Sequence, residues 1–240
     1  MRLQSIIRAI YPYACVSCDA PVETPQGLCS ACWRDAAFIT GTVCDACGAP
    51  LTGEADETPI QCDDCLTAAR PWSRGRSTLV YGGVGRKLVL ALKHGDRTDL
   101  VPTLGDWMAR AGRDLLTPDT ILVPVPLHWS RLLRRRFNQA AMLAQVIARI
   151  AGCSVQLDAV RRRRRTAPLD GHSREARFAA LAGTMAVDPD AGAALVGRQV
   201  VLVDDVMTSG ATLAAVTDAL MAAGVADVSI LTLARVVKDP

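Results

Sequence analysis

The sequence has few aromatic residues and no long apolar stretch that is free of charge. Phe, Trp and Tyr together make up 4% of the 240 residues, whereas half of all residues are hydrophobic. This composition suits a compact core of Ala, Val and Leu and is not typical of a disordered chain. Because no stretch approaches the length of a membrane-spanning helix, we predict no membrane insertion. The four tryptophans are too scattered to indicate a platform for stacking bases.

The first 13 residues also lack the features of a secretion signal. Apolar residues recur there at helical spacing, but Arg2 and Arg8 interrupt them and no small-residue cleavage site follows. We therefore expect a cytoplasmic protein. Its first turns should form a short amphipathic helix that packs on the body of the chain.

The charge of the chain is unevenly distributed. The net charge of +3 combines −5 in residues 1–70, +3 in 71–130, +9 in 131–180 and −4 in 181–240. The basic segment includes five consecutive arginines at 161–165. Such a run is usually a solvated surface, but a clamp on pyrophosphate and a track for a nucleic-acid backbone are competing interpretations. The asymmetry predicts a polyanionic partner: pyrophosphate, a nucleotide or a nucleic acid.

Eight of the nine cysteines precede residue 66 and form four Cys-x-x-Cys pairs. The pairs are Cys15 and Cys18, Cys29 and Cys32, Cys44 and Cys47, and Cys62 and Cys65. Two such turns supply the four thiolates of a tetrahedral zinc site, so four turns predict two structural Zn²⁺ ions. A cytosolic chain keeps its thiols reduced, which disfavours disulfides. Four thiolates also leave no open position for the water of a catalytic zinc.

The pairing of these turns is less certain than the metal. Sequential pairing joins the first two turns in one site and the last two in another. Spacing alone leaves an interleaved cross-brace open. Cys153 stands apart from the pairs and is expected to be a small buried residue.

Proline, arginine and glycine crowd residues 70–75 and indicate a boundary. We predict a double zinc ribbon module in residues 1–70 and a second domain in residues 71–240. Within the second domain, apolar patterns indicate strands at 77–81, 121–125, 155–160, 200–203 and 228–237. Helices are expected at 84–94, 98–114, 132–150 and 211–223. This alternation predicts an α/β fold, with a parallel sheet covered by helices on both faces.

The run VVLVDDVMTSGAT at 200–212 carries the most specific signal. Its apolar strand delivers Asp204 and Asp205 to the carboxyl end, where ligands of open α/β sheets bind. Thr208, Ser209 and Gly210 then form a short loop before a helix, and such a loop can point backbone N–H groups and hydroxyls at a phosphate. Adjacent carboxylates instead favour ribose hydroxyls or hydrated Mg²⁺. A phosphorylated ribose satisfies both, whereas an ordinary capped turn does not explain two acids in series.

This run resembles the 5-phosphoribosyl-1-pyrophosphate (PRPP) signature of type I phosphoribosyltransferases. Together with the cysteine-rich head, the whole chain resembles the ComF family, double-zinc-ribbon phosphoribosyltransferase-like proteins linked to competence and DNA uptake. Further matching segments lie at 81–83, 91–96, 123–128, 136–140, 163–166 and 173–177. The family often has Gly before its Phe-Asn-Gln motif, where this chain has Arg136.

The resemblance implies a type I phosphoribosyltransferase fold with a PRPP site. It implies that Asp204 and Asp205 are the catalytic acids and hold the ribose hydroxyls, directly or through Mg²⁺. It assigns the pyrophosphate to Leu127 and His128, under a mobile hood loop that carries Arg165, Arg174 and Arg177. Catalysis would then rest on positioning and on neutralising the leaving pyrophosphate. The residues assigned to the 5′-phosphate are Met207, Thr208, Ser209, Gly210, Ala211 and Thr212.

Two functions of different classes fit this sequence. The first is a phosphoribosyltransferase that uses Mg²⁺-PRPP and an unidentified acceptor, which the acid pair and the phosphate loop favour. The second is a PRPP-responsive adaptor that binds single-stranded DNA or a protein of the competence machinery. The zinc ribbons and the basic segment favour this second function.

Overall fold

The structure is a computed structural model that describes residues 12–53, 59–94, 97–129, 132–133, 136–164 and 173–237. The helix expected in the first 13 residues falls almost wholly outside the described residues, and Arg165 of the hood also lies outside them.

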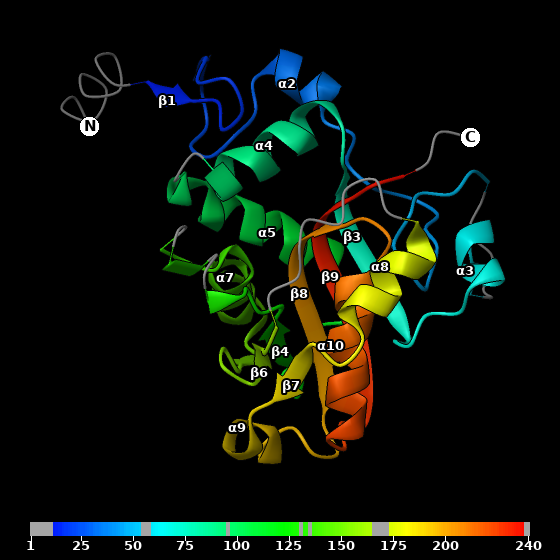
Figure 1. Ribbon diagram of the computed structural model, residues 1–240. Coiled ribbons are helices and arrows are strands. Elements are labelled where there is room, and N and C mark those ends of the chain that lie inside the picture. The colour runs from blue at the N-terminus through cyan, green and yellow to red at the C-terminus, as the bar shows by residue number, and fades with distance from the viewer. Residues whose placement is uncertain are drawn as a thin grey trace.

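A five-stranded sheet forms the centre of the molecule, with strand order β3-β9-β8-β4-β5 (Figure 1). Every neighbouring pair of strands in it runs parallel. This confirms the predicted α/β fold with a parallel sheet. The strands are β3 (Arg74–Val80), β9 (Asp227–Arg235), β8 (Gln199–Met207), β4 (Ile121–Pro124) and β5 (Ser154–Val155).

Helices cover both faces of this sheet (Figure 1). Successive strand residues point to opposite faces, so each strand contributes to two cores. Val201 and Leu231 pack in one core with α4 and α5, while Val200 and Ile230 pack in the other with α10. The uninterrupted apolar run at 200–203 follows from this burial on both sides. The helices are α4 (Gly83–His94), η1 (Thr98–Leu100), α5 (Val101–Ala111), α7 (Gln139–Ala151) and α10 (Ala211–Ala222).

A small antiparallel ribbon of β6 (Val160–Arg162) and β7 (Met185–Val187) lies outside the main sheet. Helix α8 (Arg174–Leu181), which packs against α10, lies between these two strands in the chain, and α9 (Pro189–Ala193) follows β7 (Figure 1). The single strand expected at 155–160 is wrong. That segment gives the end of β5 in the sheet and then the start of β6 in the ribbon.

The helix expected at 132–150 is also too long. Residues 132 and 133 are helical, but 136–138 are not, and α7 begins only at Gln139. Asn138 caps α7, because its Oδ1 accepts a hydrogen bond from the N–H of Ala140 at 3.1 Å. Arg136 interrupts the helical path with a φ of 66°, a left-handed conformation that favours glycine. A glycine at this position would adopt this backbone angle without strain.

We expect Arg136→Gly to stabilise the protein. Glycine removes the left-handed strain of about 1–2 kcal/mol, and the greater freedom of the unfolded chain offsets part of this gain. A net increase of about 0.5–1 kcal/mol in the free energy of unfolding should appear in urea titrations. Arg136→Ala keeps the strain and serves as the control. Equal stability of the Gly and Ala variants would contradict this account.

The amino-terminal module packs along the edge strand β3. Its elements are β1 (Tyr13–Ala14), β2 (Pro21–Val22), α2 (Ser30–Asp35) and α3 (Asp63–Thr67). Cys15 and Cys32 belong to the core on the α4 side of the sheet, whereas Cys44 and Cys47 belong to the core on the α10 side. The N–H of Gly75 in β3 donates to the carbonyl of Asp45 at 2.7 Å. The two halves of the module therefore pack on opposite faces of the sheet.

Among the described residues, the helices are too short or too polar to cross a membrane.

Candidate functional site

The eight paired cysteines form two clusters. In each cluster the four sulfur atoms lie within 4.8 Å of one another. The pairing is sequential, which settles the alternative that spacing left open. The first cluster contains Cys15, Cys18, Cys29 and Cys32, and the second contains Cys44, Cys47, Cys62 and Cys65.

Both clusters are built from the same two local structures. One half of each cluster is a tight turn closed by a residue of positive φ, Asp19 in the first cluster (59°) and Gly48 in the second (65°). The other half begins a short helix, where Cys29 and Cys62 occupy the N-cap positions of α2 and α3. The repeated construction explains how a module with little core of its own builds two similar sites.

The geometry fits zinc. A tetrahedral ion with Zn–S bonds of about 2.3 Å places its sulfurs about 3.8 Å apart. The sulfurs of Cys18 and Cys29 are 3.6 Å apart, and those of Cys47 and Cys62 are 3.7 Å apart. The two clusters therefore fit two structural zinc sites, each with four thiolate ligands and no open position.

The twin acids lie on β8, at the carboxyl end of the sheet. Pairing with β4 stops at Val203, while pairing with β9 continues to Met207. Asp204 and Asp205 therefore sit inside β8, past the end of β4, and not after the strand as the sequence suggested. Lys93, near the end of α4, forms an ion pair with Asp205 at 2.8 Å. This places a positive charge beside the acid pair.

The carboxyl of Asp204 has a raised pKa. Burial of its carboxyl and the neighbouring charge of Asp205 raise its pKa to about 7, and the positive charge of Lys93 opposes part of this shift. A site that binds ribose hydroxyls or a cation here would favour the ionised form. Such a ligand would compete with the proton for Asp204 near neutral pH.

We expect this pKa to make the ligand-free protein less stable as pH rises. The folded chain retains the proton of Asp204 up to about pH 7, whereas an unfolded aspartate loses it near about pH 4. Between these values the folded state binds more protons, so its stability falls with increasing pH and levels off above the folded pKa. In thermal unfolding, the Tm of Asp204→Asn should rise relative to the Tm of the wild type as pH increases from 5 to 7. A difference that does not change with pH would contradict the assignment.

The loop at 208–210 connects β8 to α10. Gly210 is the N-cap of α10 with φ 85°, and the hydroxyl of Ser209 accepts from the N–H of Ala211 at 3.4 Å. Thr208 is exposed, whereas Gly210 and Ala211 are buried. A polar loop thus precedes the amino terminus of a 12-residue helix, where backbone N–H groups favour an anion.

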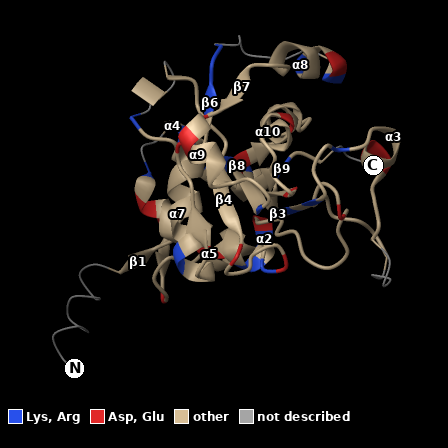
Figure 2. Ribbon diagram, turned by 90° about the horizontal axis from the view of Figure 1, so that it is seen from below, with Lys and Arg blue, Asp and Glu red and all other residues tan. Residues whose placement is uncertain are grey.

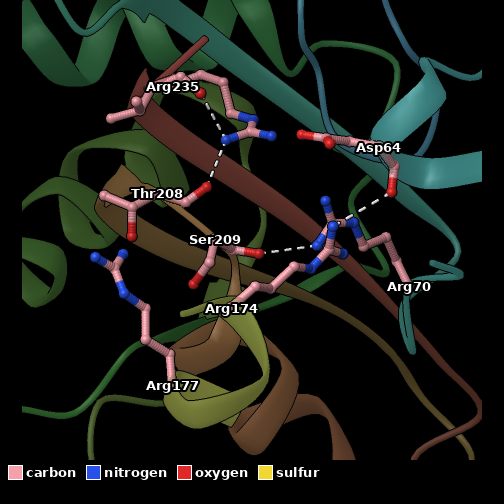
Figure 3. Close-up of a pocket in the computed structure, with 8 residues that line it drawn as sticks. Asp64, Arg70, Arg174, Arg177, Thr208, Ser209 and Arg235 are labelled. Carbon is pink, nitrogen blue, oxygen red and sulfur yellow. Dashed lines mark hydrogen bonds between the residues drawn. The ribbon is translucent and has the colours of Figure 1, made fainter. Parts of the chain in front are cut away.

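A cavity of about 250 Å³ opens beside this loop (Figure 3). It brings two predicted loop residues and two predicted hood arginines together with residues from the second zinc ribbon and the end of β9. Four arginines and one aspartate line it, and Arg174 and Arg177, for which no contact with a cysteine sulfur is seen among the described residues, make it suit an anion. The lining residues are Asp64, Arg70, Arg174, Arg177, Thr208, Ser209, Arg235 and Val236.

The two hood arginines differ in their contacts. Arg174 donates to the backbone carbonyl of Asp64 at 3.4 Å and stacks over the ring of Phe178. Arg177 points toward Thr208 (Figure 3), and its buried Nε has no hydrogen-bond partner among the described residues. The Arg177 guanidinium therefore lies beside a phosphate-type loop, where a cation favours an anionic ligand.

The predicted pyrophosphate residues follow β4, at the same end of the sheet. His128 is 6% exposed and Leu127 is partly exposed. The amide of Asn138 donates to the carbonyl of Val125 at 3.1 Å and so ties this segment to the start of α7. Neither Leu127 nor His128 lines the arginine cavity. The structure therefore groups Arg174 and Arg177 with the 208–209 loop and not with the 127–128 segment.

Sequence reasoning missed three charged residues near the acids and the loop. They are Lys93, Arg70 and Arg235. Lys93 stands in a segment that carried the family resemblance and could have been flagged there. Arg235 ends an almost fully buried strand and is only 4% exposed, so a charged residue at the end of that strand was the available signal.

The sequence matches the double zinc ribbon domain family over residues 6–66 and the phosphoribosyl transferase domain family over residues 138–239. The DNA utilization protein YhgH of Escherichia coli O6:H1 strain CFT073 is 32% identical over 231 residues, which cover 93% of this chain and 97% of that protein. Competence protein F of Haemophilus influenzae is 29% identical over 94% of this chain and 98% of its own length. Competence protein ComFC of Bacillus subtilis is 24% identical over 94% of this chain and 96% of its own length.

The structure and the comparisons indicate the same family. The structure has two four-cysteine clusters and a parallel sheet with an acid pair and a phosphate-type loop, and the relatives align over almost their full length. The chain belongs to the ComF family of double-zinc-ribbon, phosphoribosyltransferase-like proteins.

Proposed function

We propose that this protein binds Mg²⁺-PRPP at the carboxyl end of β8 and transfers its phosphoribosyl group to an acceptor. The 5′-phosphate lies on the loop that contains Thr208 and Ser209. Asp204 and Asp205 hold the ribose hydroxyls. The pyrophosphate extends toward Leu127 and His128.

The observation that carries this proposal is the change of charge along β8 and the loop after it. Two carboxylates, one of them paired with Lys93 at 2.8 Å, are followed within three residues by a loop at a helix amino terminus and a cavity with four arginines. The acids repel phosphate but accept hydrogen bonds from hydroxyls, while the loop and Arg177 attract an anion. A phosphorylated sugar carries both kinds of group, hydroxyls for the acids and a phosphate for the loop.

Phosphoribosyl transfer requires that the reacting groups are positioned and that the charge of the leaving pyrophosphate is neutralised. In the transfer, the bond from the anomeric carbon to the pyrophosphate oxygen breaks, and the acceptor forms a new bond to that carbon. Residues that fix both ends of the sugar phosphate hold the reacting atoms in place. Mg²⁺, held with PRPP at Asp204 and Asp205, would supply charge neutralisation for the pyrophosphate. No covalent intermediate with the protein is required.

Calorimetry with Mg²⁺-PRPP on zinc-replete protein tests binding. Saturable binding is expected, and the absence of any binding would overturn the proposal. Turnover is tested separately, with Mg²⁺-PRPP and a panel of purine, pyrimidine and other nitrogen acceptors. Pyrophosphate released faster than in protein-free controls supports a transferase.

Binding without turnover would favour a second candidate, a PRPP-responsive adaptor for single-stranded DNA or a DNA-uptake partner. The names of the relatives refer to competence and DNA utilization. Basic residues also lie on β6, in the antiparallel pair of β6 and β7 (Figure 2). Arg161 is 70% exposed there, although it pairs with Asp188 at 3.0 Å, and Arg163 and Arg164 are exposed. Affinity for an oligonucleotide that falls steeply with salt would support this function.

A further inference from the structure

The second cysteine cluster is joined to the phosphate loop by Arg70. The Nε of Arg70 donates to the sulfur of Cys65 at 3.3 Å, and its Nη1 donates to the backbone carbonyl of Ser209 at 2.8 Å (Figure 3). The guanidinium also stacks on Trp72, whose ring is 4% exposed and whose indole N–H donates to the carbonyl of Ala46 in the module. One side chain thus bridges a zinc ligand and the loop, although residues 70 and 209 are far apart in the chain.

Arg235 makes a second and independent bridge. Its Nη2 lies 3.8 Å from the sulfur of Cys47, and its Nη1 donates to the carbonyl of Thr208 at 2.6 Å. Arg235 is almost fully buried, which is costly for a cation unless negative partners surround it. Four thiolates around one Zn²⁺ leave two negative charges unbalanced, and two arginines restore neutrality. The metal-loaded cluster therefore accounts for the burial of Arg235 and for the contact between Arg70 and Cys65.

These bridges act on the loop in a defined way. A peptide unit is planar and trans, so its C=O and N–H point in opposite directions. Fixing the carbonyls of Thr208 and Ser209 also fixes the N–H groups of Ser209 and Gly210. Those N–H groups belong to the loop that faces the proposed 5′-phosphate. The arginines hold the loop from behind and leave its amide groups for the ligand.

The first cluster offers no comparable link. Within the part of the chain that the structure describes, its sulfurs form hydrogen bonds only with one another and with the backbone of the cluster, such as the N–H of Cys29 to the sulfur of Cys15 at 3.3 Å. Its helix α2 packs near α4 and lies apart from α3 and α8 (Figure 1), the helices that carry Asp64, Arg174 and Arg177 of the cavity. The two metal sites therefore differ in what they support.

We infer that the second zinc cluster is a support of the phosphate loop, and that Arg70 and Arg235 are positioning residues that couple zinc loading to the order of residues 207–212. Loss of zinc from this cluster removes the ion that fixes the sulfurs of Cys65 and Cys47, so both arginines lose fixed acceptors and the loop carbonyls lose fixed donors. This inference rests on the proposed function only for its effect on PRPP affinity. Its effect on the loop is independent of any ligand.

The arginine arm of the test uses Arg70→Gln, which leaves all eight thiolates in place. Amide hydrogen exchange of residues 207–212 in the ligand-free protein should become about tenfold faster, because a lost charged hydrogen bond corresponds to about that factor or more. Affinity for Mg²⁺-PRPP should fall by a similar factor with zinc content unchanged. Arg76→Gln is the matched control. Arg76 binds Asp45 of the same module at 2.9 Å but reaches neither a thiolate nor the loop.

The metal arm compares Cys62→Ser with Cys18→Ser. Each should remove one of two zinc ions by elemental analysis, but only Cys62→Ser should speed exchange at 207–212. Equal effects of the two cysteine variants, unchanged loop exchange in Arg70→Gln, or an Arg76→Gln variant that matches Arg70→Gln would each overturn the inference. If Cys62→Ser does not fold, the arginine arm still decides.

The outcomes also separate this inference from the proposed function. A wild-type protein that does not bind PRPP would overturn the proposed function, while faster loop exchange in Arg70→Gln would still support the coupling. If the wild type binds PRPP and Arg70→Gln leaves both loop exchange and affinity unchanged, the proposed function is supported and the coupling is overturned.

Discussion

The double variant Asp204→Asn, Asp205→Asn is expected to lose PRPP binding and to keep both zinc ions. Asparagine preserves the size of each side chain but removes the charge that attracts hydroxyl donors and Mg²⁺. A hydrogen bond to a charged group contributes about 1.5–3 kcal/mol, so losing two should weaken binding by about 100-fold or more. Calorimetry with Mg²⁺-PRPP measures the affinity, and elemental analysis measures the zinc.

Lys93→Met provides the matched control for this variant. It breaks the ion pair with Asp205 but leaves both carboxylates present. If the acids act on the ligand directly, the Lys93 variant should bind PRPP far better than the double Asn variant. An unchanged PRPP affinity in the double Asn variant would contradict the assignment of the site to Asp204 and Asp205. The zinc clusters would be unaffected by that result, because none of their ligands contacts these acids in the described structure.

The features that were predictable from the sequence are those encoded within short segments. Each Cys-x-x-Cys turn is local, and the apolar run at 200–203 identified the central strand because every residue in it is buried. The loop at 208–210 was recognisable because its residue types match a phosphate-binding turn. The sequential pairing of the cysteines required coordinates, since both arrangements satisfy the same spacing.

The features that could not be predicted depend on contacts between distant segments. Arg70 meets Ser209 across 139 positions, and Arg235 meets Cys47 across 188. No periodicity in sequence records such contacts. The position of Asp204 and Asp205 inside β8 has a similar origin, because pairing with β9 extends the strand after β4 has ended. The interruption before α7 depends on the backbone of Arg136, a residue type that usually continues a helix.

Gly210→Ala is expected to weaken PRPP binding by more than tenfold. Gly210 has φ 85°, so any side chain there is strained. An added Cβ would also lie 2.8 Å from Met207 Cε, 3.0 Å from the Trp72 ring and 3.3 Å from Arg70 Nη1. The methionine end can move, but Trp72 is buried and rigid, and Arg70 holds the carbonyl of Ser209. The loop must therefore shift away from its support, and its N–H groups turn away from the phosphate.

Gly224→Ala separates this effect from backbone strain alone. Gly224 has nearly the same φ, 88°, but its nearest neighbour to an added Cβ is Val196 at 3.6 Å, an ordinary contact. Backbone strain should cost both variants about 1 kcal/mol of stability, which corresponds to about 2–4 °C in Tm for a chain of this size, and the close contacts should cost Gly210→Ala more. Only Gly210→Ala should change the affinity for Mg²⁺-PRPP. Wild-type affinity in Gly210→Ala, with Tm lowered at least as far as in Gly224→Ala, would mean that the ligand does not rest on this loop. Weakened binding in Gly210→Ala alone would locate the phosphate where β8, α10 and the second zinc ribbon meet.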